Sequence, residues 1–250
     1  MKRTLNAKSS FLLAALLLLL PARAAAQDRP QTVPKSNPRQ AFAELIKPYR
    51  NMRDYTVKIQ AKVVMPNIRI PDYTAVLYFK KPDKFHIKTK NFAPIPRGNA
   101  IFNPFQFDPD KNQITFKQME TLNGAPAALY KVEPAEEEKR IRFYNVWVGG
   151  NPKRILQVES HTVKGTKALI RLSYRQIGQG TDKWLLPDKV YAHLTFPEAV
   201  NGPENLTVKD SPLSAGSARI ESMTGEGNIT ISYSEWQVNT GIDDQLFKDK

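Results

Sequence analysis

YTAVLYFKKPDKFHIKTK, residues 73–90, predicts two antiparallel strands joined by a tight turn. Pro82 and Asp83 suit the two central positions of that turn. Apolar side chains recur at every second position on one face of both strands: Ala75, Leu77, Phe79, Phe85 and Ile87. This alternation predicts a sheet with one apolar side and one solvated side, because successive side chains of a strand point to opposite faces.

The residues before this hairpin predict one helix and one long strand. Ser36 or Asn37 can cap a helix that has Pro38 in its first turn. Apolar side chains then recur at spacings of three and four residues over Phe42–Tyr49, which is typical of a helix with one apolar stripe. Asp54–Val64 alternates strictly and predicts a strand.

Seven further short strands are predicted downstream of the hairpin. They are residues 113–118, 127–133, 140–148, 154–161, 168–177, 189–196 and 228–239. A single sheet of about ten strands has to curl, either into a closed barrel or into an open half-barrel. We therefore expect a mainly β fold: one large curved antiparallel sheet that forms an incomplete β-barrel, with the helix and loops covering a concave hydrophobic cavity.

The segment Phe92–Pro109 does not follow the strand pattern. It combines four prolines with six large apolar side chains. The prolines exclude a central strand, and the aromatic residues are unusual for a solvated linker. Two interpretations stay open, a lid over a hydrophobic cavity and a loop packed on the core. As a hypothesis, we expect Phe92–Phe107 and Phe42–Tyr49 to close the cavity mouth until an acyl ligand displaces them.

The N-terminal 26 residues have the pattern of a cleaved secretory signal. A positively charged start precedes a ten-residue apolar run, Phe11–Leu20, which is too short to span a bilayer. A retained membrane anchor is the alternative. Residues 27–36 are rich in Pro and Gln and predict a disordered lead-in. We expect residues 37–250 to form one domain of an exported, periplasmic protein.

Composition argues against several function classes. The net charge is +13, but the basic residues are scattered, so nucleic acid is not an expected partner, whereas anionic head groups or an acidic protein surface are. The chain has no cysteine, and His86, His161 and His193 lack the spacing of a metal site. No catalytic motif occurs. We therefore expect a non-enzyme without catalytic residues, metal or cofactor.

Parts of the chain resemble a known family. An aromatic strand, two basic residues, Pro82 and a second aromatic strand are similar to the early hairpin of the LolA/LolB-like periplasmic lipoprotein carriers, of the LolA/RseB superfamily. The order of helix, long strand and hairpin extends the resemblance over residues 39–90. ISYSEWQVNTGIDDQLF, residues 231–247, resembles the end of such sequences. The middle third, including residues 91–139, departs from the family pattern.

The resemblance implies a carrier that binds lipoprotein acyl chains, or another lipid, and shuttles them between the inner and outer membranes. It implies an inner-membrane ABC-type releasing complex and an outer-membrane acceptor as partners. An RseB-type sensor of lipid or of mislocalised lipoproteins is the alternative. Because no cysteine is available to carry a lipid, the shuttling carrier is favoured over the lipid-anchored receptor. We also expect a monomer.

Ten residues are expected to contact the ligand. One of them is implied by the resemblance: the family commonly has an arginine before the hairpin proline, thought to tether the cover, and this chain has Lys81, which lacks the planar fork of arginine. The others are apolar residues of strand faces or of the lid. The set is Leu77, Phe79, Lys81, Phe85, Ile87, Phe102, Phe105, Ile170, Leu172 and Leu194. Val190 shares the apolar face of its strand and is also expected to face the interior.

Overall fold

The computed structural model describes residues 37–65, 68–69, 71–89, 102–134, 141–178, 183–197 and 225–248. They all belong to one compact unit, Val33–Lys250. The expected signal segment, residues 1–26, and the expected lead-in, residues 27–36, lie outside the described residues. None of the helices in the described part of the chain is long and apolar enough to cross a membrane.

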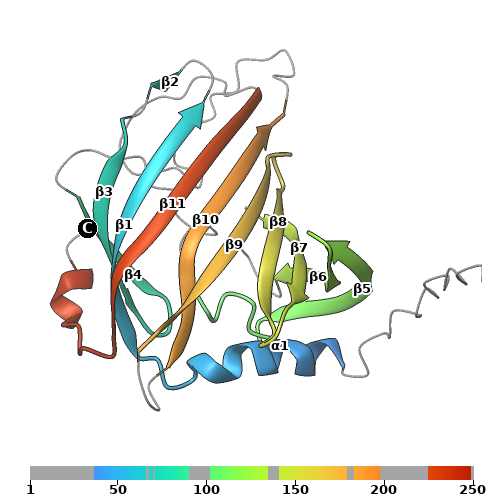
Figure 1. Ribbon diagram of the computed structural model, residues 1–250, viewed down its shortest axis with the longest axis horizontal. Coiled ribbons are helices and arrows are strands. Elements are labelled where there is room, and N and C mark those ends of the chain that lie inside the picture. The colour runs from blue at the N-terminus through green and yellow to red at the C-terminus, as the bar shows by residue number, and fades with distance from the viewer. Residues whose placement is uncertain are drawn as a thin grey trace, which may run out of the picture. The chain divides into compact units, whose positions relative to one another are not determined.

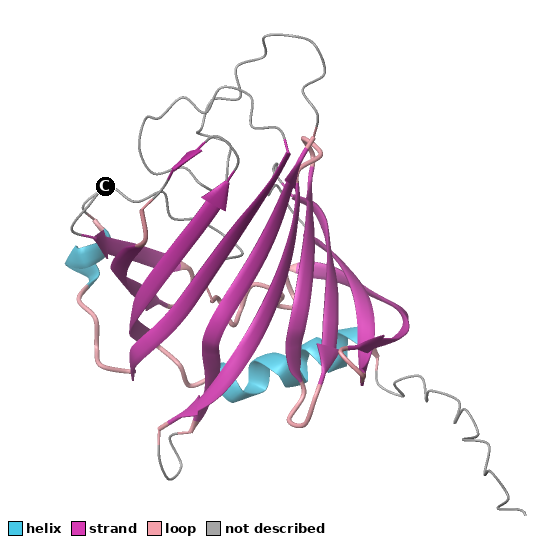
Figure 2. Ribbon diagram, turned by 45° about the horizontal axis from the view of Figure 1, so that its top comes forward, coloured by secondary structure: helices cyan, strands magenta, loops and turns pink. Residues whose placement is uncertain are grey.

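The described part begins with helix α1 (Pro38–Ile46), which continues into the 3-10 helix η1 (Lys47–Tyr49). The Asn37 side chain caps α1 by accepting a hydrogen bond from the Arg39 backbone N–H at 2.9 Å. Pro38 occupies the first turn, where its missing N–H costs nothing. The helix lies across the strands near one end of the sheet (Figure 2), with Phe42 as its buried residue.

Eleven strands of the described part form one antiparallel sheet (Figure 1). They are β1 (Asp54–Met65), β2 (Ile68–Arg69), β3 (Tyr73–Lys80), β4 (Lys84–Thr89), β5 (Asn112–Leu122), β6 (Ala125–Pro134), β7 (Ile141–Gly149), β8 (Arg154–Thr162), β9 (Lys167–Ile177), β10 (Trp184–Phe196) and β11 (Gly225–Val238). The order is β4-β3-β1-β11-β10-β9-β8-β7-β6-β5, and β2 pairs with β1 alone. The terminal strands β4 and β5 do not pair with each other within the described residues, so the sheet is an open half-barrel and the predicted fold class is confirmed.

The first and last long strands lie side by side in this sheet. β1 pairs with β11 from Tyr55 opposite Val238 to Val64 opposite Asn228. The strands from β5 to β11 each pair with the next strand along the chain. The β1–β11 pairing therefore joins this meander to the β3–β4 hairpin.

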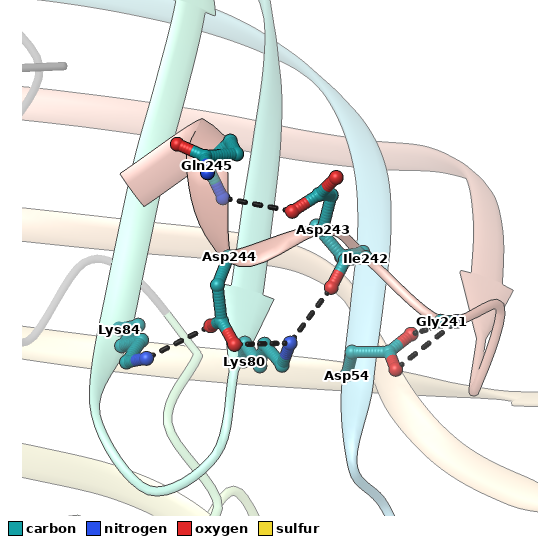
Figure 3. Close-up of polar contacts among 8 residues, drawn as sticks. All are labelled: Asp54, Lys80, Lys84, Gly241, Ile242, Asp243, Asp244 and Gln245. Atoms are coloured by element: carbon teal, nitrogen blue, oxygen red, sulfur yellow. Dashed lines mark hydrogen bonds and ion pairs between the residues drawn. The ribbon is translucent and has the colours of Figure 1, made fainter. Parts of the chain in front are cut away.

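The segment after β11 is held by a buried carboxylate (Figure 3). Asp54 is 3% exposed and accepts hydrogen bonds from the backbone N–H groups of Thr240 at 2.8 Å and Gly241 at 3.2 Å. Gly241 has φ of +82°, a left-handed conformation that glycine adopts without a steric penalty. These contacts turn the chain back toward the hairpin.

A short 3-10 helix, η3 (Asp244–Phe247), then contacts the hairpin. Asp244 pairs with Lys84 at 2.8 Å and with Lys80 at 3.2 Å (Figure 3). The hydrogen bonds from Lys84 and Lys80 lower the pKa of the Asp244 carboxyl below its ordinary value. The C-terminal segment is therefore tied to β3 and β4 by charge as well as by backbone contacts.

The strand register places the apolar residues on one face, called here the inner face. Leu77 lies opposite Ile87 and Phe79 opposite Phe85, and residues directly opposite each other in an antiparallel sheet share a face. The same face continues through β1 and β11 to β10 and β9. It carries all eight strand residues that the sequence assigned to the interior: Leu77, Phe79, Phe85, Ile87, Ile170, Leu172, Val190 and Leu194. Each of these side chains is either buried or packed against the core.

Candidate functional site

Two segments far apart in the sequence pack together over the inner face. We call them the cover: α1 with η1, and the cover loop Phe102–Lys111. The rings of Phe42 and Phe107 meet edge to face with centroids 6.4 Å apart, and those of Tyr49 and Phe102 with centroids 5.6 Å apart. The sequence paired Phe42–Tyr49 with Phe92–Phe107, and the part of that loop that the structure describes does contact the helix. Residues 92–101 lie outside the described residues.

A polar clamp joins the same two segments at the start of α1. Arg39 donates a hydrogen bond from Nη1 to the Pro109 carbonyl oxygen at 2.7 Å. Its other terminal nitrogen pairs with the Asp110 carboxylate. The side chains of Arg39 and Asp110 are 61% and 76% exposed, so water screens this pair and it contributes little to stability. It fixes the position of the cover loop relative to α1.

The cover is seated on the sheet mainly by aromatic contacts. Phe105 stacks on Phe79 of β3 with centroids 6.4 Å apart, and Phe107 meets Tyr144 of β7 edge to face at 5.2 Å. One polar contact has a fully buried donor: the Tyr55 hydroxyl donates to the Phe102 carbonyl oxygen at 2.5 Å, and Tyr55 is 0% exposed. Burial raises the pKa of Tyr55 well above its ordinary value, so this donor keeps its proton.

Lys81 reaches both segments of the cover. Its Nζ lies 4.8 Å from the centroid of the Phe105 ring and 3.4 Å from the carbonyl oxygen of Arg50, which directly follows η1. A cation over an aromatic face at an exposed site contributes roughly 0.5–1 kcal/mol. The resemblance implied that this lysine tethers the cover. Lys81 does contact the cover, and its tethering role stays a prediction.

A cavity of about 330 Å³ lies between the cover and the sheet. Its size is at the lower end for small-molecule sites, which span roughly 300–1,000 Å³. Most of its lining is apolar and comes from α1, η1, the cover loop and strands β8 to β10. The apolar lining includes Phe42, Leu45, Ile46, Phe102, Phe107, Ile155, Val158, Ile170, Leu172 and Val190.

The expected ligand contacts divide into two groups. Three of the ten, Phe102, Ile170 and Leu172, line this cavity, and so does Val190. The other seven do not line it within the described part of the chain. They are Leu77, Phe79, Lys81, Phe85, Ile87, Phe105 and Leu194. On the β3–β4 side, Phe79 packs against Tyr55, Phe85 and Phe105. Ligand contact by any of the ten stays a prediction.

Sequence reasoning missed one wall of the cavity. Lys153 and Arg154, at the β7–β8 turn, and Lys183 and Trp184, at the start of β10, all line it. The predicted strands 140–148 and 154–161 imply a turn between them, but strand patterns do not say which other element that turn will lie beside. Burial raises the pKa of Tyr49, another lining residue, to about 12, so its hydroxyl is neutral and donates to the Leu185 carbonyl oxygen at 2.6 Å.

The described residues offer no arrangement that resembles a metal centre. They contain no group of three or more His, Cys, Asp or Glu side chains that could hold an ion. The histidines lie on three different strands: His86 beside Tyr78, His161 3.0 Å from Glu159, and His193 2.9 Å from Asn228. What the cavity offers is an apolar surface with a few polar groups at one wall, which is suited to binding.

Comparison with known proteins gives the fold. No protein-family model and no curated protein matches this sequence. Among solved structures, an outer membrane lipoprotein-sorting protein domain from Vibrio parahaemolyticus aligns over 83% of this chain and 95% of its own, with 13% identity and a TM-score of 0.53. A DUF1329 family protein from Desulfovibrio piger aligns over 86% and 98%, with 11% identity and a TM-score of 0.55.

A LolA superfamily protein from Nitrosomonas europaea aligns over 85% of this chain and 98% of its own, with 11% identity and a TM-score of 0.50. These identities are low, so the similarity lies in the backbone: an open antiparallel sheet with a helix across it. The resemblance first seen in the β3–β4 hairpin is thereby confirmed for the whole sheet. This chain has the LolA/RseB-like fold.

Proposed function

We propose that this protein is a periplasmic carrier that binds the acyl chain of a lipoprotein, or of another lipid, in the cavity beneath its cover. One observation supports this proposal above the others: a largely apolar cavity of about 330 Å³ is lined on one side by aromatic side chains of the two cover segments and on the other side by the sheet. Ligand can therefore enter when the cover moves while the strand ladders stay intact.

The energetics of an acyl chain fit such a site. Each buried CH₂ contributes roughly 0.8 kcal/mol, so a chain of about sixteen carbons gains on the order of 12 kcal/mol on full burial. Several fully buried chains would exceed the roughly 20 kcal/mol at which non-covalent affinity saturates, and release would then fail. A cavity near the lower end of ligand-site volumes, which holds one chain or part of one, keeps binding reversible.

Exchange of contacts gives the ligand a preference for the open state. Burying one phenylalanine contributes roughly 1.5–3 kcal/mol, so a cover seated by Phe42, Phe102, Phe105 and Phe107 is held by several kcal/mol. An acyl chain that takes over contacts of the displaced rings offsets part of that loss. A ligand shifts such an equilibrium only through a difference in affinity for the two states. Here the difference arises because the acyl chain binds the apolar surface that the displaced phenylalanine rings expose.

The test is titration of the mature protein with a fluorescent C16 probe. Phe102→Ser alters the cavity wall, and Phe143→Ser is a matched control because Phe143 stacks on His161, on the outer face. We expect the first variant to change probe affinity at least about threefold, a difference of roughly 0.7 kcal/mol, and the second to leave it unchanged, with similar losses of thermal stability. Failure of the unmodified protein to bind the probe would reject the proposal.

Delivery of the ligand requires partners. By the same proposal, an inner-membrane ABC-type complex releases the acylated cargo and an outer-membrane acceptor receives it. Native mass spectrometry of protein purified from its own periplasm measures whether acyl ligand co-purifies. We expect a mass increase that matches an acylated species and disappears after detergent extraction. A membrane-protein partner in place of that ligand would favour a sensor over a carrier.

A further inference from the structure

Three cationic side chains line a cavity whose lining is otherwise mostly apolar. Lys153 lies in the β7–β8 turn, Arg154 is the first residue of β8, and Lys183 directly precedes β10. β8 and β10 both flank β9 and run antiparallel to it, so their first residues emerge at the same end of the sheet. Three positive charges from two segments that are distant in sequence are thereby gathered at one wall.

These charges are not balanced by nearby carboxylates within the described residues. The cavity lining there includes no Asp or Glu, and no ion pair joins a described carboxylate to Lys153, Arg154 or Lys183. Arg154 donates to the Pro152 carbonyl oxygen at 3.1 Å, and its guanidinium lies 6.0 Å from the centroid of the Tyr174 ring. Burial raises the pKa of Tyr174, so that ring is neutral and supplies no counter-charge.

Cations that no described carboxylate balances favour an anion at that wall. Water screens the exposed lysines only in part there, because the apolar wall on one side has a low dielectric constant, and charge interactions are stronger at lower dielectric. An arginine also offers a planar pair of donors that matches a carboxylate or a phosphate. A ligand composed only of hydrocarbon would use none of these donors.

We propose that the ligand of this cavity carries an anionic head group, a carboxylate or a phosphate, which Lys153, Arg154 and Lys183 bind while the acyl chain fills the apolar part. This inference rests on the proposed function and specifies the class of ligand: an anionic amphiphile with one chain in the cavity. The cavity would then select ligands by the charge of the head group, at the cationic wall, and by the length of the acyl chain.

A pair of probes that differ only in charge tests this proposal. The unmodified protein is titrated with a fluorescent C16 fatty acid and with its methyl ester. The double variant Lys153→Gln/Lys183→Gln is compared with Lys62→Gln/Lys189→Gln, which removes the same charge from exposed residues of the outer face. We expect the first double variant to bind the acid about tenfold more weakly, which corresponds to roughly 1.4 kcal/mol, and the ester with unchanged affinity.

The possible outcomes distinguish failure of the carrier proposal from failure of the head-group proposal. If neither probe binds the unmodified protein, the carrier proposal fails and the head-group proposal fails with it. If acid and ester bind equally well to all variants, the carrier proposal stands and the anionic head group is overturned. Equal weakening by the control pair would also overturn it, because the effect would then come from net charge alone. Raising the salt concentration should weaken binding of the acid and spare the ester.

The anionic group can belong to a free lipid or to an acylated peptide. A palmitoylated peptide with one aspartate beside the acyl group, and the same peptide with asparagine, separate these sources. Preference for the aspartate peptide over the fatty acid identifies an acylated protein as the source, and the reverse identifies a free lipid. Lack of any preference for the charged member of either pair contradicts the proposal.

Discussion

Replacing Tyr55 by phenylalanine should loosen the cover without disturbing the sheet. The substitution keeps the ring, which stacks on Phe79 with centroids 5.0 Å apart, and removes only the hydroxyl that donates to the Phe102 carbonyl oxygen at 2.5 Å. A net intramolecular hydrogen bond contributes roughly 0.5–1.5 kcal/mol. At about 1.4 kcal/mol per factor of ten, the open fraction of the cover should rise roughly two- to twelvefold.

Two measurements should report the same factor. Hydrogen exchange of the cover-loop amides, residues 102–111, follows the opening equilibrium directly and should accelerate by that factor. Affinity for the fluorescent C16 probe should increase by the same factor, since the apparent dissociation constant is the intrinsic one divided by the competent fraction. Agreement between them ties opening of the cover to ligand entry.

Tyr191→Phe is the matched control. It also deletes a single hydroxyl that makes one hydrogen bond, to the Asn228 side chain at 2.6 Å on the outer face. We expect it to leave both exchange of the cover loop and probe affinity unchanged. Uniformly faster exchange across the sheet in Tyr55→Phe, or unchanged exchange in the cover loop, would refute the reasoning.

Three further substitutions test the packing that supports the site. Asp54→Ala removes the carboxylate that accepts charge-assisted hydrogen bonds from the backbone N–H groups of Thr240 and Gly241, and should lower the free energy of unfolding by ~3 kcal/mol in urea titrations; a loss below about 1 kcal/mol would contradict that role. Gly149→Ala places a Cβ 2.9 Å from a backbone carbonyl oxygen of β6 and should cost ~1–3 kcal/mol by the same assay, an estimate that unchanged stability would contradict. Arg39→Ala removes an exposed clamp and should shift the melting temperature by less than about 4 °C; a larger shift would show that the clamp supports more than the cover loop.

The sequence predicted the strands well where alternation is unbroken. Asp54–Val64 was expected and β1 is Asp54–Met65. The predictions fell short at irregularities of pairing. β10 begins at Trp184 rather than at residue 189, because a register shift between Pro187 and Lys189 accommodates the proline and breaks the alternation.

β5 shows the same effect. Residues 113–118 were predicted and the strand is Asn112–Leu122, with a register shift between Phe116 and Gln118 that changes which side chains face inward. Period-two patterns cannot follow a strand through such a shift. The alternation pattern also could not predict the pairing of β1 with β11, because strand order depends on contacts between distant segments.

The sequence predicted which side chains share the inner face of the sheet, but not where on that face the cavity lies. Parity along each strand correctly put Leu77, Phe79, Ile170 and Leu172 on the inner face. It could not say which part of that face would stay unfilled. This depends on where the cover packs: Phe105 of the cover loop packs on Phe79 of β3, whereas a cavity lies between α1 and strands β8 to β10. The cationic wall was missed for the same reason.

The sheet and the cover differ in how they are held, and this difference supports a carrier role. Each pair of neighbouring long strands is joined by a ladder of backbone hydrogen bonds, as in the nine residue pairs between β1 and β11. The cover is held by ring contacts, by the hydroxyl groups of Tyr49 and Tyr55, by Lys81 and by the exposed Arg39 clamp. Elements with few backbone bonds to the rest of a protein open at lower free energy than its central strands. Under the proposed function, ligand entry would need only the cover to move, and the sheet would keep its shape through repeated loading and release.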